Sequence, residues 1–153
     1  MAKFVYKMQN ILELKYKLEE QAKSEYSQAM SELREEEKKL DTLNARKNEY
    51  QAGLKEARSG KLILGEIRRY EQSIYTMEIM IENQVETIEH CKQLVEHRRE
   101  KLNEVMMERK MHEKMKEKQF ELFLAELNEA EKKEIDELVS FQYNKPADSR
   151  EEF

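Results

Sequence analysis

The stretch Arg58-Ser-Gly-Lys-Leu-Ile-Leu-Gly65 interrupts two long runs of helical hydrophobic periodicity. Glycine tolerates the left-handed backbone conformation that ends many helices, so Ser59-Gly60 is interpreted as a helix stop. The three aliphatic residues that follow are expected to cover the turn, and Gly65 is expected to permit a bend or a close approach. This stretch converts a potential single rod into a predicted hairpin of two helices.

The run before this stretch predicts a first helix over about residues 3–58. Its seam residues alternate in steps of three and four, with two successive steps of four from Leu18 to Ala22 to Tyr26. Such a stutter is expected to unwind a supercoil locally. The full predicted seam is Phe4, Met8, Ile11, Lys15, Leu18, Ala22, Tyr26, Ala29, Leu33, Glu36, Leu40, Leu43, Lys47, Tyr50, Leu54 and Ala57.

The run after this stretch predicts a second helix over about residues 62–143, with the tip of the hairpin at about 59–65. Pro146 disfavours helix at the residue before it, so one domain over 1–146 and a disordered tail over 147–153 are expected. The predicted seam of the second helix is Ile63, Ile67, Tyr70, Ile74, Met77, Ile81, Gln84, Ile88, Cys91, Val95, Arg98, Leu102 and Val105.

The composition supports the same architecture. Of the 153 residues, 40% are charged and 39% are hydrophobic, which suits the narrow seam of a coiled coil better than the core of a globule. The predicted fold is therefore all-α, a long antiparallel two-helix coiled-coil hairpin. A net charge of −5 argues against nucleic-acid binding. The lack of a long apolar run or signal segment, together with a single cysteine, predicts a cytoplasmic protein.

The hairpin also predicts which residues face each other across the helices. A turn at residues 60–63 brings Lys15 near Glu108 and Glu25 near Arg98, two pairs of opposite charge. The second helix then extends beyond the first by about 20 residues, or about 30 Å at 1.5 Å per residue.

Motifs for catalysis or cofactor binding are weak. Gly60 to Gly65 matches the spacing of a phosphate-binding loop, but Glu66 stands where a lysine is needed. His90 and His97 lie about 10 Å apart on a helix, too far to share one metal ion. Cys91 falls on the seam and His112 is expected to be solvated. No catalytic, cofactor or metal site is predicted, and the chain is not expected to be an enzyme.

Two apolar surfaces remain as candidates for protein contacts. One lies beyond the predicted reach of the first helix and consists of Met106, Met107, Met111, Met115, Phe120, Phe123, Leu124 and Leu127. Methionine side chains adapt to irregular partner surfaces, although Phe4, Val5 and Met8 could fold over part of this stripe. The other surface lies nearer the tip, where Tyr50 and Tyr70 fit the seam and Tyr75 falls outside it.

In their order and spacing, several weak motifs resemble the FliJ family of the bacterial flagellar type III export apparatus over nearly the whole chain. They are Phe4 with Ile11-Leu12, Leu40-x-x-Leu43 with Asn48-Glu49-Tyr50, Tyr70-x-Gln72-x-Ile74-x-x-Met77-Glu78-x-x-Ile81, Lys101-Leu102-x-x-Val105-x-x-x-Arg109, and Glu131-Lys132-Lys133-x-x-Asp136-Glu137. The resemblance implies a stalk-like component that inserts into the hexameric export ATPase FliI, contacts the export gate protein FlhA and escorts export chaperones, at the cytoplasmic face of the membrane.

The resemblance and the apolar stripe together nominate two sets of contact residues. The ATPase-contact candidates are Phe4, Met8, Met111, Met115, Phe120 and Phe123. The gate-contact candidates are Leu43, Tyr50, Tyr75, Met77 and Met80. The chain is expected to be a monomer on its own, and the alternative is a generic cytoplasmic scaffold or a dimeric coiled coil.

Overall fold

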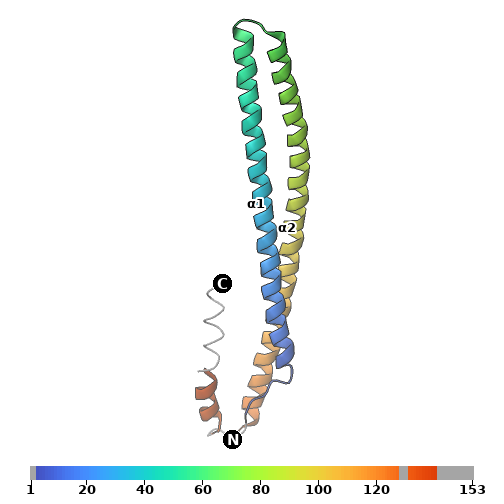
Figure 1. The fold of residues 1–153 in the computed structure, drawn as a ribbon. Coiled ribbons are helices and arrows are strands. Elements are labelled where there is room, and N and C mark those ends of the chain that lie inside the picture. The colour runs from blue at the N-terminus through green and yellow to red at the C-terminus, as the bar shows by residue number, and fades with distance from the viewer. Residues whose placement is uncertain (1–2, 128–130, 141–153) are drawn as a thin grey trace. The chain divides into compact units, whose positions relative to one another are not determined.

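A computed structural model describes residues 3–127 and 131–140 of the chain (Figure 1). Two long α-helices dominate, α1 over Gln9–Ser59 and α2 over Leu64–Glu126. Residues 131–140 are also helical, and no strand occurs within the described ranges. The predicted all-α class is confirmed, with two long helices on either side of one short turn.

The ends of the helices differ from those predicted from sequence. α1 begins at Gln9 rather than near residue 3, and the N–H of Gln9 donates to the carbonyl of Tyr6 at 3.1 Å. The segment before it is rich in aromatic and β-branched residues, which are weaker helix formers. α2 ends at Glu126 rather than near residue 143, where the N–H of Leu127 donates to the Leu124 carbonyl three residues back. Residues 141–146 and the predicted tail over 147–153 lie outside the described ranges.

The turn between the helices is held by hydrogen bonds at both of its sides. The hydroxyl of Ser59 donates to the carbonyl of Glu56 at 2.9 Å and closes the end of α1. At the start of α2, the carbonyl of Ile63 accepts the N–H groups of Glu66 and Ile67 at 3.1 and 3.2 Å. Ile63 therefore directly precedes α2, and its carbonyl accepts the first hydrogen bonds of that helix.

The three glycines act differently from the expectation. α1 ends at Ser59, so the predicted position of the helix stop is confirmed, but none of the three glycines adopts a positive φ, so Gly60 does not end the helix in a left-handed conformation. Gly65 lies in the first turn of α2 with no atom within 4 Å of a Cβ built there, so it makes no close approach. The close approach occurs at Gly53, where such a Cβ would lie 2.6 Å from Cε1 of Tyr70.

Contacts divide the chain into two compact units, which are described separately. The hairpin unit is Glu19–Glu104 and the terminal unit combines Met1–Leu18 with Val105–Phe153. In the hairpin unit, α1 and α2 lie side by side (Figure 1), and the partner on α2 rises in number as the residue on α1 falls. The contacts that establish this order are Arg58–Glu71 at 3.1 Å, Lys47–Glu78 at 3.6 Å, Glu36–Gln84 at 2.6 Å and Glu25–Arg98 at 3.1 Å. This order is consistent with a hairpin.

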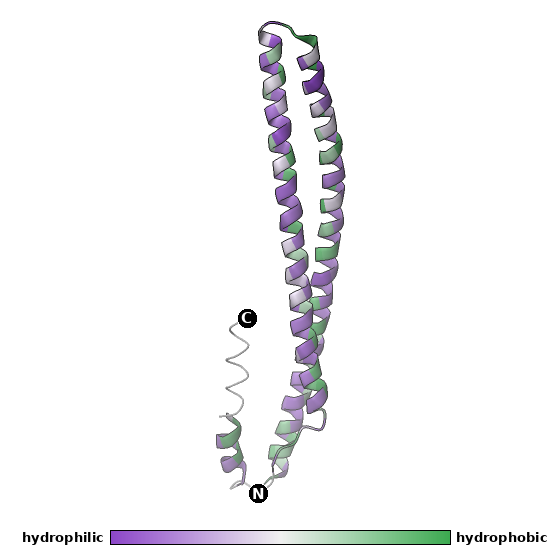
Figure 2. Cartoon of the chain, in the orientation of Figure 1, coloured by the Kyte–Doolittle hydropathy of each residue, from purple (hydrophilic) through white to green (hydrophobic). Residues whose placement is uncertain are grey.

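The core of the hairpin unit is narrow, as two helices alone can bury only the stripe along which they touch. Its buried apolar residues all lie on the predicted seams, and they are Ala22, Ala29, Leu33, Met77 and Ile88. Apolar residues alternate with long polar stretches along both helices (Figure 2).

The predicted seam of α1 is wrong by one residue near its start. Leu12 is 2% exposed and Glu19 is also buried, whereas the predicted seam residues Ile11 and Leu18 are exposed. The observed positions run from Met8 through Leu12, Lys15 and Glu19 to Ala22 in regular steps of four and three, and the stutter disappears. Hydrophobicity favours Leu18 over Glu19 as the seam residue, because leucine is apolar. In the structure the buried carboxylate of Glu19 is paired with the ammonium of Lys23, which lies 3.6 Å away.

Candidate interaction surfaces

The aromatic residues nominated for ATPase contact pack against one another in the terminal unit. The ring of Phe4 lies 5.1 Å from that of Phe120 in an edge-to-face arrangement, and 5.5 Å from that of Phe123. Aromatic pairs at these separations are favourable beyond their buried area. The segment before α1 therefore covers part of the predicted apolar stripe, and these three residues are half-buried.

The methionines of the same unit lie outside this packing. Met107 and Met111 are 70% and 59% exposed, Met115 is 36% exposed, and Leu122 is exposed as well. Met107, Met111 and Met115 follow one another at steps of four, so they occupy one face of α2. We call Met107, Met111, Met115 and Leu122 together the methionine stripe. Met8, the remaining ATPase-contact candidate, is half-buried on α1.

Polar residues occupy the seam of α2 beyond Val105, where the predicted seam ends. Continuing from Val105 in steps of four and three, the half-buried positions are Arg109, His112 and Lys116. His112 is therefore less exposed than predicted, and its Nδ1 atom has no hydrogen-bond partner among the described residues. In this segment Met107, Met111 and Met115 are exposed, whereas Met106 is half-buried.

Charged contacts join α1 to α2 inside the terminal unit. The ammonium of Lys15 lies 2.8 Å from the carboxylate of Glu108, which confirms the predicted pair. That hydrogen bond, and then the charge of Lys15, lower the pKa of Glu108 below its ordinary value. Further along, the hydroxyl of Tyr16 donates a hydrogen bond to one carboxylate oxygen of Glu113. The other oxygen of that carboxylate accepts a hydrogen bond from Nη1 of Arg109 at 3.1 Å. These contacts hold the two helices in register beside the methionine stripe.

The gate-contact candidates belong to the hairpin unit. Tyr75 and Met80 are exposed on α2, and Leu43 and Tyr50 are half-buried on α1. Met77 is only 8% exposed, so it packs between the helices and supports its neighbours rather than offering a surface. The expectation that Tyr75 lies off the seam is met, as is the expectation that Tyr50 lies on it.

A polar contact crosses the seam beside these candidates. The side-chain amide of Gln84 donates to the carboxylate of Glu36 at 2.6 Å and to its backbone carbonyl at 2.8 Å. Lys39 lies 3.0 Å from the same carboxylate. The hydrogen bond from Gln84, followed by that from Lys39, lowers the pKa of Glu36. A polar pair at one seam position fixes the register of the helices, since a shifted register leaves its groups unpaired.

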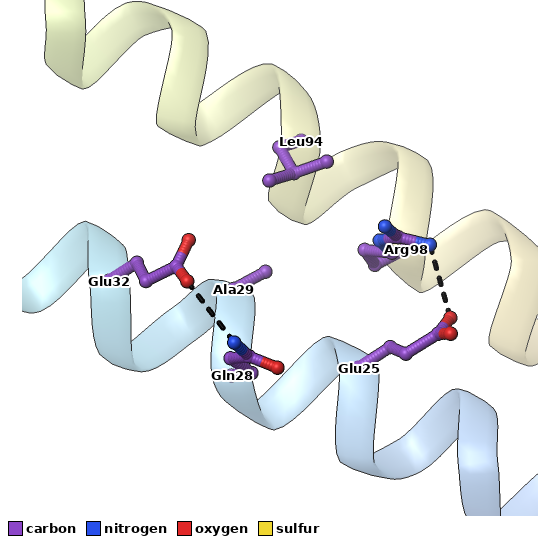
Figure 3. A pocket seen from close by; sticks show the side chains of 6 residues that line it. All are labelled: Glu25, Gln28, Ala29, Glu32, Leu94 and Arg98. Carbon is purple, nitrogen blue, oxygen red and sulfur yellow. Dashed lines mark hydrogen bonds and ion pairs between the residues drawn. The ribbon is translucent and has the colours of Figure 1, made fainter.

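A shallow groove of about 120 Å³ lies at another point of the hairpin unit (Figure 3). Ala29, Gln28 and Glu32 of α1 face Leu94 of α2 across it, and the Glu25–Arg98 ion pair closes one end at 3.1 Å. Ligand sites for small organic molecules usually have volumes of about 300–1,000 Å³. The groove exists because alanine leaves space opposite Leu94, and it is too small and open to hold a substrate.

Within residues 3–127 and 131–140, no group of three or more His, Cys, Asp or Glu side chains has the geometry to hold a metal ion. None of the helices described is long and apolar enough to cross a membrane. Cys91 is a half-buried free thiol on the seam.

Sequence reasoning missed a second row of exposed apolar residues in the terminal unit. Ile11, Leu14 and Leu18 of α1 are all exposed, and steps of three and four place them on one face of the helix. The signal was present in the sequence, but two of the three were assigned to the seam. A correct seam through Leu12 and Glu19 would have identified this row.

Comparison with known proteins gives a consistent result. The family model described as "Flagellar FliJ protein" matches residues 4–148. The Flagellar FliJ protein of Bacillus subtilis (strain 168) is 30% identical over 147 residues, covering 92% of this chain and 95% of that protein. No solved structure matches. With a family match over almost its whole length, the chain belongs to the flagellar FliJ protein family.

Proposed function

We propose that this chain acts as a stalk, which inserts its terminal unit into a hexameric export ATPase and promotes ATP hydrolysis. Membership of the FliJ family makes it a component of flagellar protein export, in a family that is generally not enzymatic. The observation that carries the proposal is the methionine stripe, a row of exposed apolar side chains in the unit that contains both chain ends. Exposed apolar rows of this kind mark protein contacts.

We further propose that the helices form an antiparallel coiled coil. The order of contacts in the hairpin unit and the regular steps of four and three on α1 support this arrangement. Ile11 and Leu18 each directly precede a seam residue of α1, and Met115 directly precedes Lys116 on α2. In an antiparallel coiled coil, the residues that directly precede these seam positions on one helix lie beside the equivalent residues of the other helix. The methionine stripe and the row on α1 would then form one apolar surface.

A stalk of two helices suits an ATPase ring for a physical reason. The two helices are different in sequence, so a hexamer around them presents six identical subunits with six different contacts. Binding to the assembled ring and not to separate subunits stabilises the ring by mass action. Methionine side chains can adapt to each of the resulting environments, because they are unbranched and flexible.

The test is the rate of ATP hydrolysis by the export ATPase from the same organism, with increasing amounts of the full chain. The double variant Met111→Ser and Met115→Ser removes two exposed side chains without altering the aromatic cluster. Fully burying one methionine side chain contributes about 1.5–3 kcal/mol, so without these two side chains half-maximal stimulation should require at least about tenfold more protein.

Val85→Ser is the matched control, because Val85 is also exposed and belongs to the hairpin unit. It should stimulate hydrolysis as the original chain does. Phe120→Ser with Phe123→Ser should lose stimulation too, but with reduced helicity because these rings pack on Phe4. Full stimulation by the methionine variant, with normal helicity, would refute the contact.

A second contact, with the export gate, is proposed for the hairpin unit. Exposed Tyr75 and Met80 support it, beside half-buried Leu43 and Tyr50. Tyr75→Ser with Met80→Ser should weaken binding to the cytoplasmic part of the gate protein, measured by calorimetry, while ATPase stimulation persists. Binding unchanged by this double variant would assign the gate contact to another surface.

The remaining roles are export-chaperone escort and a position at the cytoplasmic face of the membrane. Both are proposed on family membership alone.

We also propose that the chain is a monomer when free, since its apolar seam is already covered by its own second helix. Light scattering should give the mass of one chain, 18.5 kDa. A stable dimer would favour the alternative of a dimeric scaffold.

A further inference from the structure

The turn between α1 and α2 carries the most exposed consecutive apolar residues of the hairpin unit. Leu62, Ile63 and Leu64 are 67%, 48% and 69% exposed. They appear as a hydrophobic cap at the beginning of α2, at the end of the hairpin (Figure 2). We call these three residues the apolar apex. Neither the ATPase contact nor the gate contact proposed above uses them.

The residues around the apex carry a net positive charge, whereas the whole chain is negatively charged. Arg58, Lys61, Arg68 and Arg69 are all exposed, and Glu66 is the one acidic residue between positions 58 and 69. This gives the segment a net charge of +3, within a chain of net charge −5. Arg58 forms a surface ion pair with Glu71 at 3.1 Å. The other three cations form no ion pair within the part of the chain that the structure describes.

We propose that this end of the hairpin docks on an anionic lipid bilayer, with the apolar apex inserted and the four cations at the level of the lipid phosphates. The depths agree with this arrangement. Arg68 and Arg69 follow Leu64 by four and five residues, which is about 6–8 Å along a helix. Apolar groups of interfacial proteins enter the headgroup and acyl boundary to a depth of about 5–10 Å.

The shape of the apex favours a lipid surface over a protein groove. Three consecutive residues at a turn point in different directions, whereas a groove for a helix recognises side chains spaced three and four residues apart. A fluid interface accepts apolar side chains in any direction. It also supplies phosphate groups beside an apolar interior, which matches the charge and the apolarity of this segment together. An acidic protein is the competing partner.

The first test is co-sedimentation of the full chain with vesicles of phosphatidylcholine and phosphatidylglycerol in equal parts, and with vesicles of phosphatidylcholine alone. Binding is expected to the anionic vesicles and should weaken as salt increases. Leu62→Ser and Leu64→Ser should each reduce partitioning by about tenfold or more, since each removes an aliphatic side chain from the bilayer. Arg68→Gln with Arg69→Gln should reduce it by about 30-fold.

Val85→Ser and Lys92→Gln are the matched controls, because both residues are exposed on the same unit away from the turn. Both should bind vesicles normally. The apex variants should retain full helicity and full stimulation of the export ATPase, so a failure here is distinguishable from a failure of the stalk proposal. Equal binding to neutral vesicles, or apex variants that bind as well as the original chain, would overturn the proposal.

A second test reports insertion directly. The chain contains no tryptophan, so Leu62→Trp introduces a single fluorophore at the apex. Its emission should shift to shorter wavelength on addition of anionic vesicles, whereas that of Tyr75→Trp should not. An unshifted emission would overturn insertion. Apex-dependent binding to polyglutamate without binding to vesicles would overturn the lipid proposal in favour of an acidic protein partner.

Discussion

Replacing Gly53 by alanine tests how closely the two helices pack near the turn. A Cβ at this position would lie 2.6 Å from Cε1 and 2.8 Å from Cζ of Tyr70, closer than real Cβ contacts. The tyrosine ring must therefore move away. If about 80 Å² of its surface is exposed, the loss is about 2 kcal/mol at 25 cal/mol per Å².

An opposing term comes from the backbone. Alanine is better than glycine in a helix interior by about 1 kcal/mol, and Gly53 has no positive φ that would forbid it. The net effect of Gly53→Ala should be a loss of about 1 kcal/mol, or about 2–4 °C in Tm. Urea unfolding followed by circular dichroism measures this difference.

A double-mutant cycle separates the two terms. With Tyr70→Ala already in place the clash is absent, so adding Gly53→Ala should stabilise the chain by about 1 kcal/mol. The coupling energy between the two positions is then about 2 kcal/mol. Ala52→Gly, at an exposed neighbour, should cost about 1 kcal/mol and calibrates the helix term. Gly53→Ala stabilising both backgrounds equally would refute the close approach.

Three further predictions concern the hairpin unit. Glu36→Cys with Gln84→Cys, in a Cys91→Ser background, should form a disulfide within one chain on oxidation; cross-linked dimers on a non-reducing gel would contradict the hairpin. Because hydrogen bonds lower the folded-state pKa of Glu36, this carboxylate should stabilise the fold above its ordinary pKa of 4.5 and lose that effect as the pH falls through the lowered value. Glu36→Gln should therefore flatten the acid limb of a stability–pH curve, and an unchanged limb would count against this. Ile88→Ala should cost about 2–4 kcal/mol in urea unfolding, against at most about 0.5 kcal/mol for exposed Val85→Ala, and similar losses at both would contradict the seam.

Much of the fold could be predicted from the periodicity of the sequence. The seam through Ala22, Leu33, Met77 and Ile88 follows from heptad spacing, because helical side chains recur on one face every three or four residues. The register follows from the position of the turn, which is why the pairing of Lys15 with Glu108 was predicted correctly.

The predictions that the structure contradicts concern seam positions occupied by polar residues and a glycine whose role depends on packing between the two helices. Glu19 and His112 lie inward although their side chains are polar, and Leu18 lies outward although it is apolar. Hydrophobicity alone assigns such positions to the wrong face. The role of Gly53 depends on the ring of Tyr70 across the helix pair, and nothing local in the sequence specifies that contact.

The most direct test of the proposed stalk is the amount of flagellar filament protein secreted by the host organism. Deleting the gene should abolish or strongly reduce secretion, and both the original chain and Val85→Ser should restore it. Met111→Ser with Met115→Ser should fail to restore it although the protein is present at a normal level. Normal secretion in the deletion strain, or full restoration by the methionine variant, would contradict the account.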